Sequence, residues 1–348
     1  MNLNIDLKKN QFEDFSSILE LYIEFVTNGK FEEYVRYGNV KPNESAKLFF
    51  ELLNKNFGWK EDKRNLQARQ IIASVNFFNT CYNAMNGLEP AQLSDLDKED
   101  MLLFITDPRL LMEIENLKAQ KRTRRQFELL DLALRMHKQL YPKAIILKKQ
   151  VEKTDAKIEQ IFTEPEKPVE AATPTSGAAI EKYVNDKSSA TKVQNANYLI
   201  QGLLDHADKN RAAATSEAYA TNIVKNAWDY KPEKEARGIA QVVTNVSLFS
   251  VGNQVVNGLT VELGETEKRG MSYMAAHPNY SEIMAAVKAG ATSEYKQEVV
   301  NTSIQIAEQL QPYAIAEQVA LYDATQELNK VVQQEMVINH VEDYGREM

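Results

Sequence analysis

The stretch LQPYAIAEQVALYDATQELNKVVQQEMVI, residues 310–338, is the clearest structural signal in this chain. Nine positions in it follow one another in alternating steps of four and three residues, and seven of the nine are apolar. Such spacing places side chains on one face of an α-helix. Because proline suits the first turn of a helix, we predict one amphipathic helix from Pro312 to His340. The nine positions are Leu310, Ala314, Glu317, Leu321, Ala324, Leu328, Val331, Glu335 and Ile338.

This apolar face needs a partner, because a stripe of that length is not left in water. Glu317 and Glu335 interrupt it, so pairing two copies would bring like charges together unless a basic residue of the other copy pairs with them. Lys330 is the only Lys or Arg within residues 310–338, which argues against self-pairing. We therefore expect the stripe to pack within the C-terminal part of the chain.

Helical spacing continues through the rest of the sequence, and no strand-like alternation longer than a few residues occurs. We expect helices to stop at Asn28-Gly29 and at Asn86-Gly87, because Asn and Gly tolerate the left-handed backbone at a helix end. Asp107-Pro108 should open a long helix that Tyr141-Pro142 kinks or breaks. Ala144, Val151 and Ile158 then repeat every seven residues, which suggests a short coiled coil.

A proline-containing segment, TEPEKPVEAATPTSG at residues 163–177, divides the chain. It is too poor in large apolar residues to offset its ordering entropy, so we expect a flexible linker. Residues 1–162 carry 25 Lys and Arg against 24 Asp and Glu, whereas the remainder carries 16 against 25. We predict an all-α fold of two helical modules, residues 1–162 and 178–348, joined by this linker.

The composition limits the classes of function. A net charge of −8 argues against bulk attraction to nucleic acid. The single cysteine, Cys81, excludes an internal disulfide framework and fits a reducing compartment. Residues 238–261 lack charge but hold several Asn and Gln, so we interpret them as a buried core segment. The N-terminus has no continuous apolar stretch, so we expect a cytoplasmic protein, or one exported without a conventional signal peptide into a host cytoplasm.

Catalytic and cofactor motifs are absent from the sequence. The four histidines show no metal-ligand spacing, and we interpret each as a surface or interface residue. Cys81 has aromatic, neutral neighbours, which indicates a buried structural cysteine. Neither glycine-rich phosphate loop pattern occurs, so we predict no catalytic residue, metal site or cofactor.

One basic run is the sequence's only candidate site. Ten Lys and Arg lie between Lys118 and Lys149, and Lys118, Lys121, Arg122 and Arg125 would share a face of a continuous helix. Such a face can bind an acidic protein, an anionic membrane surface or a phosphate backbone, or it can be a solvated face that binds nothing. The predicted binding residues are Lys118, Lys121, Arg122, Arg124 and Arg125.

The order of these regions resembles that of effectors injected into host cells by intracellular bacteria, in particular VipA-like actin-nucleating effectors. The shared layout is a helical N-terminal region, a basic coiled-coil-like stretch at 109–162, a proline-containing linker and a helical C-terminal region. The tail QQEMVINHVEDYGREM, residues 333–348, is similar to the Glu-bearing C-terminal signals of such proteins. The resemblance implies action in a host cytoplasm on actin or endosomal membranes.

The sequence favours a non-enzymatic helical interaction protein with a protein partner. Two alternatives stay open. One is a structural or phage-type assembly protein, since Ala- and Gln-rich helices suit virion parts. The other is an enzyme whose site is dispersed over the C-terminal half. The oligomeric state cannot be derived from these patterns.

Overall fold

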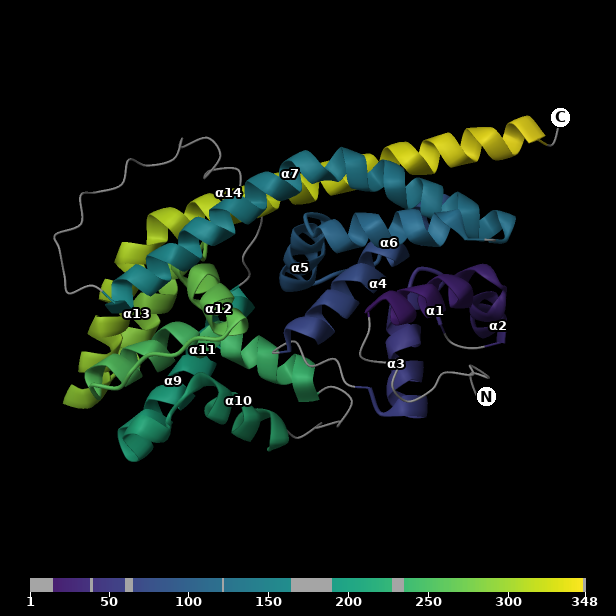
Figure 1. Ribbon diagram of the computed structural model, residues 1–348. Coiled ribbons are helices and arrows are strands. Elements are labelled where there is room, and N and C mark those ends of the chain that lie inside the picture. Colours follow the sequence, from purple (N-terminus) through teal and green to yellow (C-terminus); the bar gives the residue numbers. More distant parts are fainter. Residues whose placement is uncertain are drawn as a thin grey trace. The chain divides into compact units, whose positions relative to one another are not determined.

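The computed structural model describes residues 15–37, 40–59, 65–120, 122–163, 190–226 and 235–346 (Figure 1). Within these ranges all regular structure is helical, which confirms the predicted all-α fold class. The helices are α1 Phe15–Thr27, α2 Lys30–Tyr37, α3 Ser45–Phe57, α4 Leu66–Met85, α5 Asp95–Ile105, α6 Pro108–Ala119, α7 Arg124–Thr163, α9 Ala190–Asn210, η2 Arg211–Ala213, α10 Ser216–Lys225, α11 Glu235–Val256, α12 Glu265–Ala275, α13 Tyr280–Gly290 and α14 Glu294–Arg346.

Several helix ends lie where the local sequence predicts them. α1 ends just before Asn28-Gly29 and α4 just before Asn86-Gly87, and both glycines have positive φ angles, 80° and 62°. Asp107 caps α6, its side chain accepting a hydrogen bond from the backbone N–H of Arg109. Glycine after a helix and aspartate before one satisfy backbone groups that the helix itself leaves unpaired.

Each of the two longest helices contains a proline in its interior, which excludes the helix break expected at Pro142 and the helix start expected at Pro312. α7 continues through Pro142 without a break, and α14 begins 18 residues before Pro312 rather than at it. A proline inside a helix removes one backbone hydrogen bond. In α14 the flanking Leu310 and Ala314 are fully buried, so tertiary packing on both sides of Pro312 outweighs that loss.

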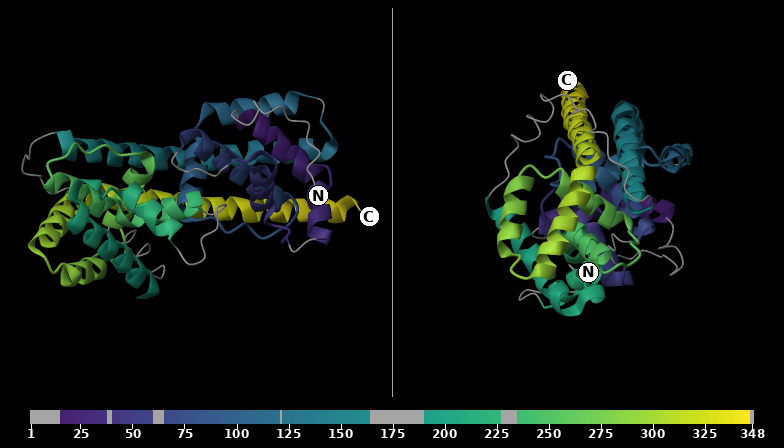
Figure 2. Two further views of the ribbon diagram at one scale, coloured as in Figure 1. Left: turned by 90° about the horizontal axis from the view of Figure 1, so that it is seen from below. Right: turned by 90° about the vertical axis from the view of Figure 1, so that its left-hand side faces the viewer.

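The chain forms two compact units whose boundaries differ from those of the expected modules. Unit 1 consists of Met1–Lys148 with Asp323–Met348, and unit 2 consists of Lys149–Tyr322. Both α7 and α14 therefore contribute to each unit. α14 has 53 residues, or roughly 80 Å of helix, which is more than one small domain spans. Figure 2 shows α14, in olive to yellow, as one uninterrupted helix. Of the expected linker, all but Thr163 lies outside the described residues.

Unit 1 has an aromatic core. Tyr22 of α1 and Phe49 of α3 are completely buried and meet edge to face, with ring centroids 5.2 Å apart. The buried hydroxyl of Tyr22 lies 2.6 Å from that of Ser45, which donates a 2.7 Å hydrogen bond to Asn79 of α4. This network gives the buried hydroxyls of Tyr22 and Ser45 and the amide oxygen of Asn79 hydrogen-bond partners.

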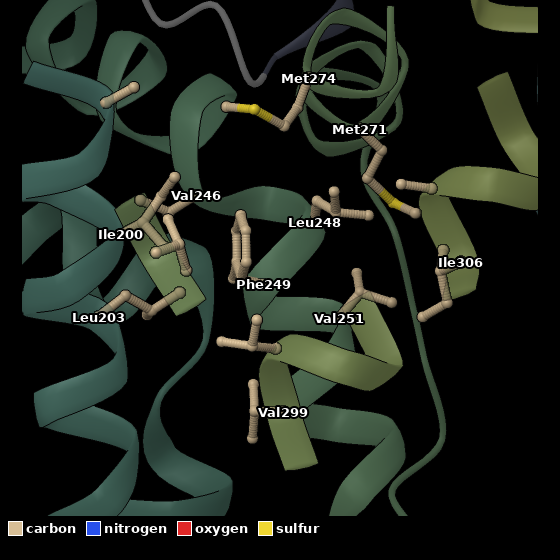
Figure 3. Close-up of a cluster of buried hydrophobic side chains, with 14 of the residues drawn as sticks. Ile200, Leu203, Val246, Leu248, Phe249, Val251, Met271, Met274, Val299 and Ile306 are labelled. Carbon is tan, nitrogen blue, oxygen red and sulfur yellow. The ribbon is translucent and has the colours of Figure 1, made fainter. Parts of the chain in front are cut away.

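Unit 2 packs around α11. Figure 3 shows the ring of Phe249 in a cluster with Ile200 and Leu203 of α9, and all three side chains are completely buried. Two glycines allow close helix contacts. A Cβ at Gly252 would lie 2.9 Å from the Val299 carbonyl oxygen of α14, and one at Gly270 of α12 would lie 2.8 Å from the Cα of Thr244. Both contacts are closer than a methyl group tolerates.

The uncharged segment 238–261 belongs largely to this core, as predicted. Asn253, fully buried on α11, donates a hydrogen bond to the Arg211 carbonyl (3.0 Å) and accepts one from the Tyr295 hydroxyl (2.6 Å). The guanidinium of Arg211 stacks over the Tyr295 ring at 3.5 Å. Asn253 thus finds its hydrogen-bond partners inside unit 2. Among the described helices, none combines the length and the apolar composition that crossing a bilayer requires.

Candidate interaction surface

The basic run is divided between two helices, so its residues do not share one helical face as the sequence suggested. α6 ends at Ala119 and α7 begins at Arg124. Thr123 and Gln126 explain the new start. The Thr123 side chain accepts a hydrogen bond from the Gln126 N–H (3.3 Å), and the Gln126 side chain accepts one from the Thr123 N–H (3.0 Å). This reciprocal pattern is a capping box, a signal that was present in the sequence.

Lys118 and Arg122 bind within unit 1. The Lys118 ammonium lies 2.5 Å from the carboxylate of Asp131 and 4.9 Å from the centroid of the Phe127 ring. The hydrogen bond from Lys118 holds the pKa of Asp131 below its ordinary value, and the positive charge of Arg135 adds to the effect. Arg122 is only 9% exposed and donates to Glu20 of α1 at 2.9 Å. These two cations therefore stabilise the fold.

The other predicted binding residues differ in exposure. Arg125 pairs with Glu32 of α2 and donates to Asn86 at 3.0 Å. Arg124 is 74% exposed and pairs only with Glu128, one turn along α7. Lys121 lies outside the described residues. Of the four described candidates, only Arg124 presents most of its side chain to solvent.

The carboxylates in the α14 stripe have basic partners on other helices. Glu335, 1% exposed, accepts a 3.0 Å hydrogen bond from Arg135 of α7, within unit 1. Glu317, also 1% exposed, accepts one of 2.9 Å from Arg269 of α12, within unit 2. Arg269 also pairs with Asp155 of α7. The stripe therefore packs within the chain, as predicted, but against both units and not only the C-terminal part.

Cys81 and His137 both lie in buried surroundings. Cys81 is completely buried, and burial raises the pKa of its thiol. His137 donates from Nε2 to the Ile105 carbonyl at 2.9 Å, and burial lowers its pKa. Across the described parts of the chain, no group of three or more His, Cys, Asp or Glu could hold a metal ion.

A second stripe lies on the exposed side of α7, within unit 1. Three of its four apolar members, Phe127, Leu134 and Tyr141, are seven residues apart, and Phe127 and Tyr141 are 47% and 41% exposed. We call this face the outer stripe. Steps of three and four residues link its eight positions: Arg124, Phe127, Asp131, Leu134, Lys138, Tyr141, Ile145 and Lys148.

The lysines of the outer stripe differ from the predicted basic residues. Lys138 and Lys148 are exposed, and neither forms an ion pair with a described residue. Both lysines belong to the basic run of the sequence, but neither is among the predicted binding residues. The seven-residue spacing of Phe127, Leu134 and Tyr141 was the signal that could have identified this face.

No known protein family, curated protein or solved structure matches this chain.

Proposed function

We propose that the protein is a non-enzymatic helical interaction protein that binds a partner protein through the outer stripe of α7. The observation that carries this proposal is the exposure of Phe127 and Tyr141 at seven-residue spacing. A helix that shows an apolar stripe to solvent, as well as burying its opposite face, has a surface available for another helix.

The polar contacts in the units support the same proposal. Glu317 and Glu335 are each neutralised by an arginine, and His137 is bonded to a backbone carbonyl. A catalytic acid or base needs a titratable group free to exchange a proton with substrate. These side chains are instead used to hold helices together.

The layout of the sequence supports a wider role. Because the order of regions resembles injected bacterial effectors, we propose action in a host cytoplasm, with actin or an endosomal membrane as the target. This part of the proposal rests on the resemblance, while the binding surface rests on the geometry of α7.

Affinity capture with the full chain tests the proposal. The immobilised protein is exposed to host-cell and bacterial lysates, and bound proteins are identified by mass spectrometry. We expect a host protein to be retained by the native chain and lost with Tyr141→Asp, and actin co-sedimentation checks the named target directly. Capture of no protein above a bare-resin control, or a high-order symmetric assembly in light scattering, would contradict the proposal.

A further inference from the structure

We infer that the outer stripe of α7 docks an acidic amphipathic helix of a partner protein. This inference rests on the proposed function and names the chemistry of the partner. It follows from the shape of the surface, from its charges and from the pairings that those charges disfavour.

The shape of the stripe fits a helix. Phe127, Leu134 and Tyr141 recur every seven residues, the repeat by which one helix packs along another. Residues 124–148 provide roughly 36 Å of helix in unit 1, enough for three heptads of contact. The stripe is a ridge one helix face wide, so its natural complement is the apolar stripe of a second helix.

The charges of the stripe favour an acidic partner. Arg124, Lys138 and Lys148 stand along it, against one acidic residue, Asp131. The Asp131 carboxylate is already occupied, since Lys118 lies 2.5 Å from one oxygen and Arg135 lies 2.6 Å from the other. Neither Lys138 nor Lys148 forms an ion pair with a described residue, although the charge of Lys148 helps to lower the pKa of Asp107. Carboxylates flanking the apolar stripe of an incoming helix would supply ion-pair partners for these lysines.

The same charges disfavour two other occupants. A second copy pairing in parallel would place Lys138 against Lys138 and Lys148 against Lys148, and antiparallel pairing would place Arg124 opposite Lys148. An anionic membrane would attract each cation that lies near its surface. That attraction is opposed by the net charge of −8 on the whole chain.

The test uses two designed peptides of about 20 residues, or about three heptads, with Leu at the a and d positions. One carries Glu at the e and g positions and the other carries Lys. Each is titrated into the full chain, with binding followed by fluorescence anisotropy and peptide helicity by circular dichroism. We expect the Glu peptide to bind and become helical, and the Lys peptide to bind at least tenfold more weakly.

Charge reversal provides the decisive variant. Lys138→Glu with Lys148→Glu should weaken binding of the Glu peptide about tenfold and improve binding of the Lys peptide. The matched control is Lys41→Glu with Lys55→Glu, which changes the net charge equally at exposed lysines of unit 1 outside α7. Thermal melts check that each variant is folded.

Three results would overturn the inference: no binding of the Glu peptide, equal binding of both peptides, or equal loss in the reversal and control variants. Tighter binding to phosphatidylserine vesicles than to the Glu peptide would assign the stripe to a membrane instead. If lysate capture succeeds and is unaffected by charge reversal, the proposed function survives and this inference fails. If lysate capture retains nothing, the proposed function itself fails.

Discussion

The stripe of α14 and the outer stripe of α7 have the same three- and four-residue spacing, and charged residues interrupt both. In α14 the interrupting Glu317 and Glu335 are 1% exposed. In α7 the interrupting Lys138 and Lys148 are exposed. Two stripes with one spacing thus have different environments, although Ile338 at the end of the α14 stripe is 47% exposed.

The difference lies in the partners of the charges. Glu317 meets Arg269, and Glu335 meets Arg135, so each carboxylate has a cation in its own unit when it leaves water. No described acidic residue forms an ion pair with Lys138 or Lys148. Since a buried charge is tolerated only when it is paired, the supply of counter-charges separates a core stripe from a surface stripe.

The largest expected effect comes from placing an unpaired charge in each stripe. Leu328→Asp in α14 buries a carboxylate where the leucine is 6% exposed, and should destabilise unit 1 by about 3 to 5 kcal/mol. Tyr141→Asp in the outer stripe, where the tyrosine is 41% exposed, should change stability by less than about 1 kcal/mol. Urea unfolding followed by circular dichroism measures both. Similar losses in the two variants would show that the outer stripe is part of the core.

The two buried carboxylates should differ in how much stability the chain loses when the arginine paired with each is replaced, and this effect should be smaller. Arg269→Met leaves Glu317 buried without its cation and should cost about 3 kcal/mol or more, because Arg269 is itself 3% exposed. Arg135→Met should cost less, about 1 to 2 kcal/mol, because Arg135 is 42% exposed and Gln139 still reaches Glu335 at 3.4 Å. Chemical unfolding of both variants gives the comparison.

A double replacement controls for lost packing around Arg269. Arg269→Met combined with Glu317→Leu removes both charges and should recover most of the stability lost by Arg269→Met alone. A double variant no more stable than the single one would show that the arginine acts through shape and not through its charge.

The smallest effect concerns pH and the inner side of α7. Burial lowers the pKa of His137 below its ordinary 6.5, so below that pH the unfolded chain binds a proton that the folded chain resists. Stability of unit 1 should therefore fall as pH drops from about 7 to 5, by at most about 1.4 kcal/mol per pH unit from this residue. His137→Gln retains a donor for the Ile105 carbonyl and should flatten the curve in that window. An unchanged slope would mean that other groups control the pH dependence.

Much of the helical architecture follows from local sequence. The caps at Asp107, Asn28-Gly29 and Asn86-Gly87 act over a few residues, so their effects can be predicted without tertiary information. The effects of the two prolines could not be predicted from local sequence. Whether Pro142 and Pro312 break a helix depends on how strongly the flanking turns are packed, and that packing comes from distant segments.

The candidate surface was only partly accessible to sequence reasoning. The basic run overlaps the part of α7 that carries the outer stripe, but Arg122 and Arg125 pair with Glu20 and Glu32, which lie about 100 residues earlier in the chain. Net charge along one segment cannot show which cations are already paired. Neither Lys138 nor Lys148 forms an ion pair with a described residue, although the charge of Lys148 helps to lower the pKa of Asp107.

The sequence by itself determined the all-α class, the helical faces and many helix ends, because these depend on residues within a few turns of one another. Tertiary structure alone decided that α14 and α7 contribute to both units, and which charged residues of each stripe are paired. Those outcomes depend on burying apolar area together with its counter-charges, and the required partners are distant in sequence. Arg135 and Glu335, 200 residues apart, form one such pair.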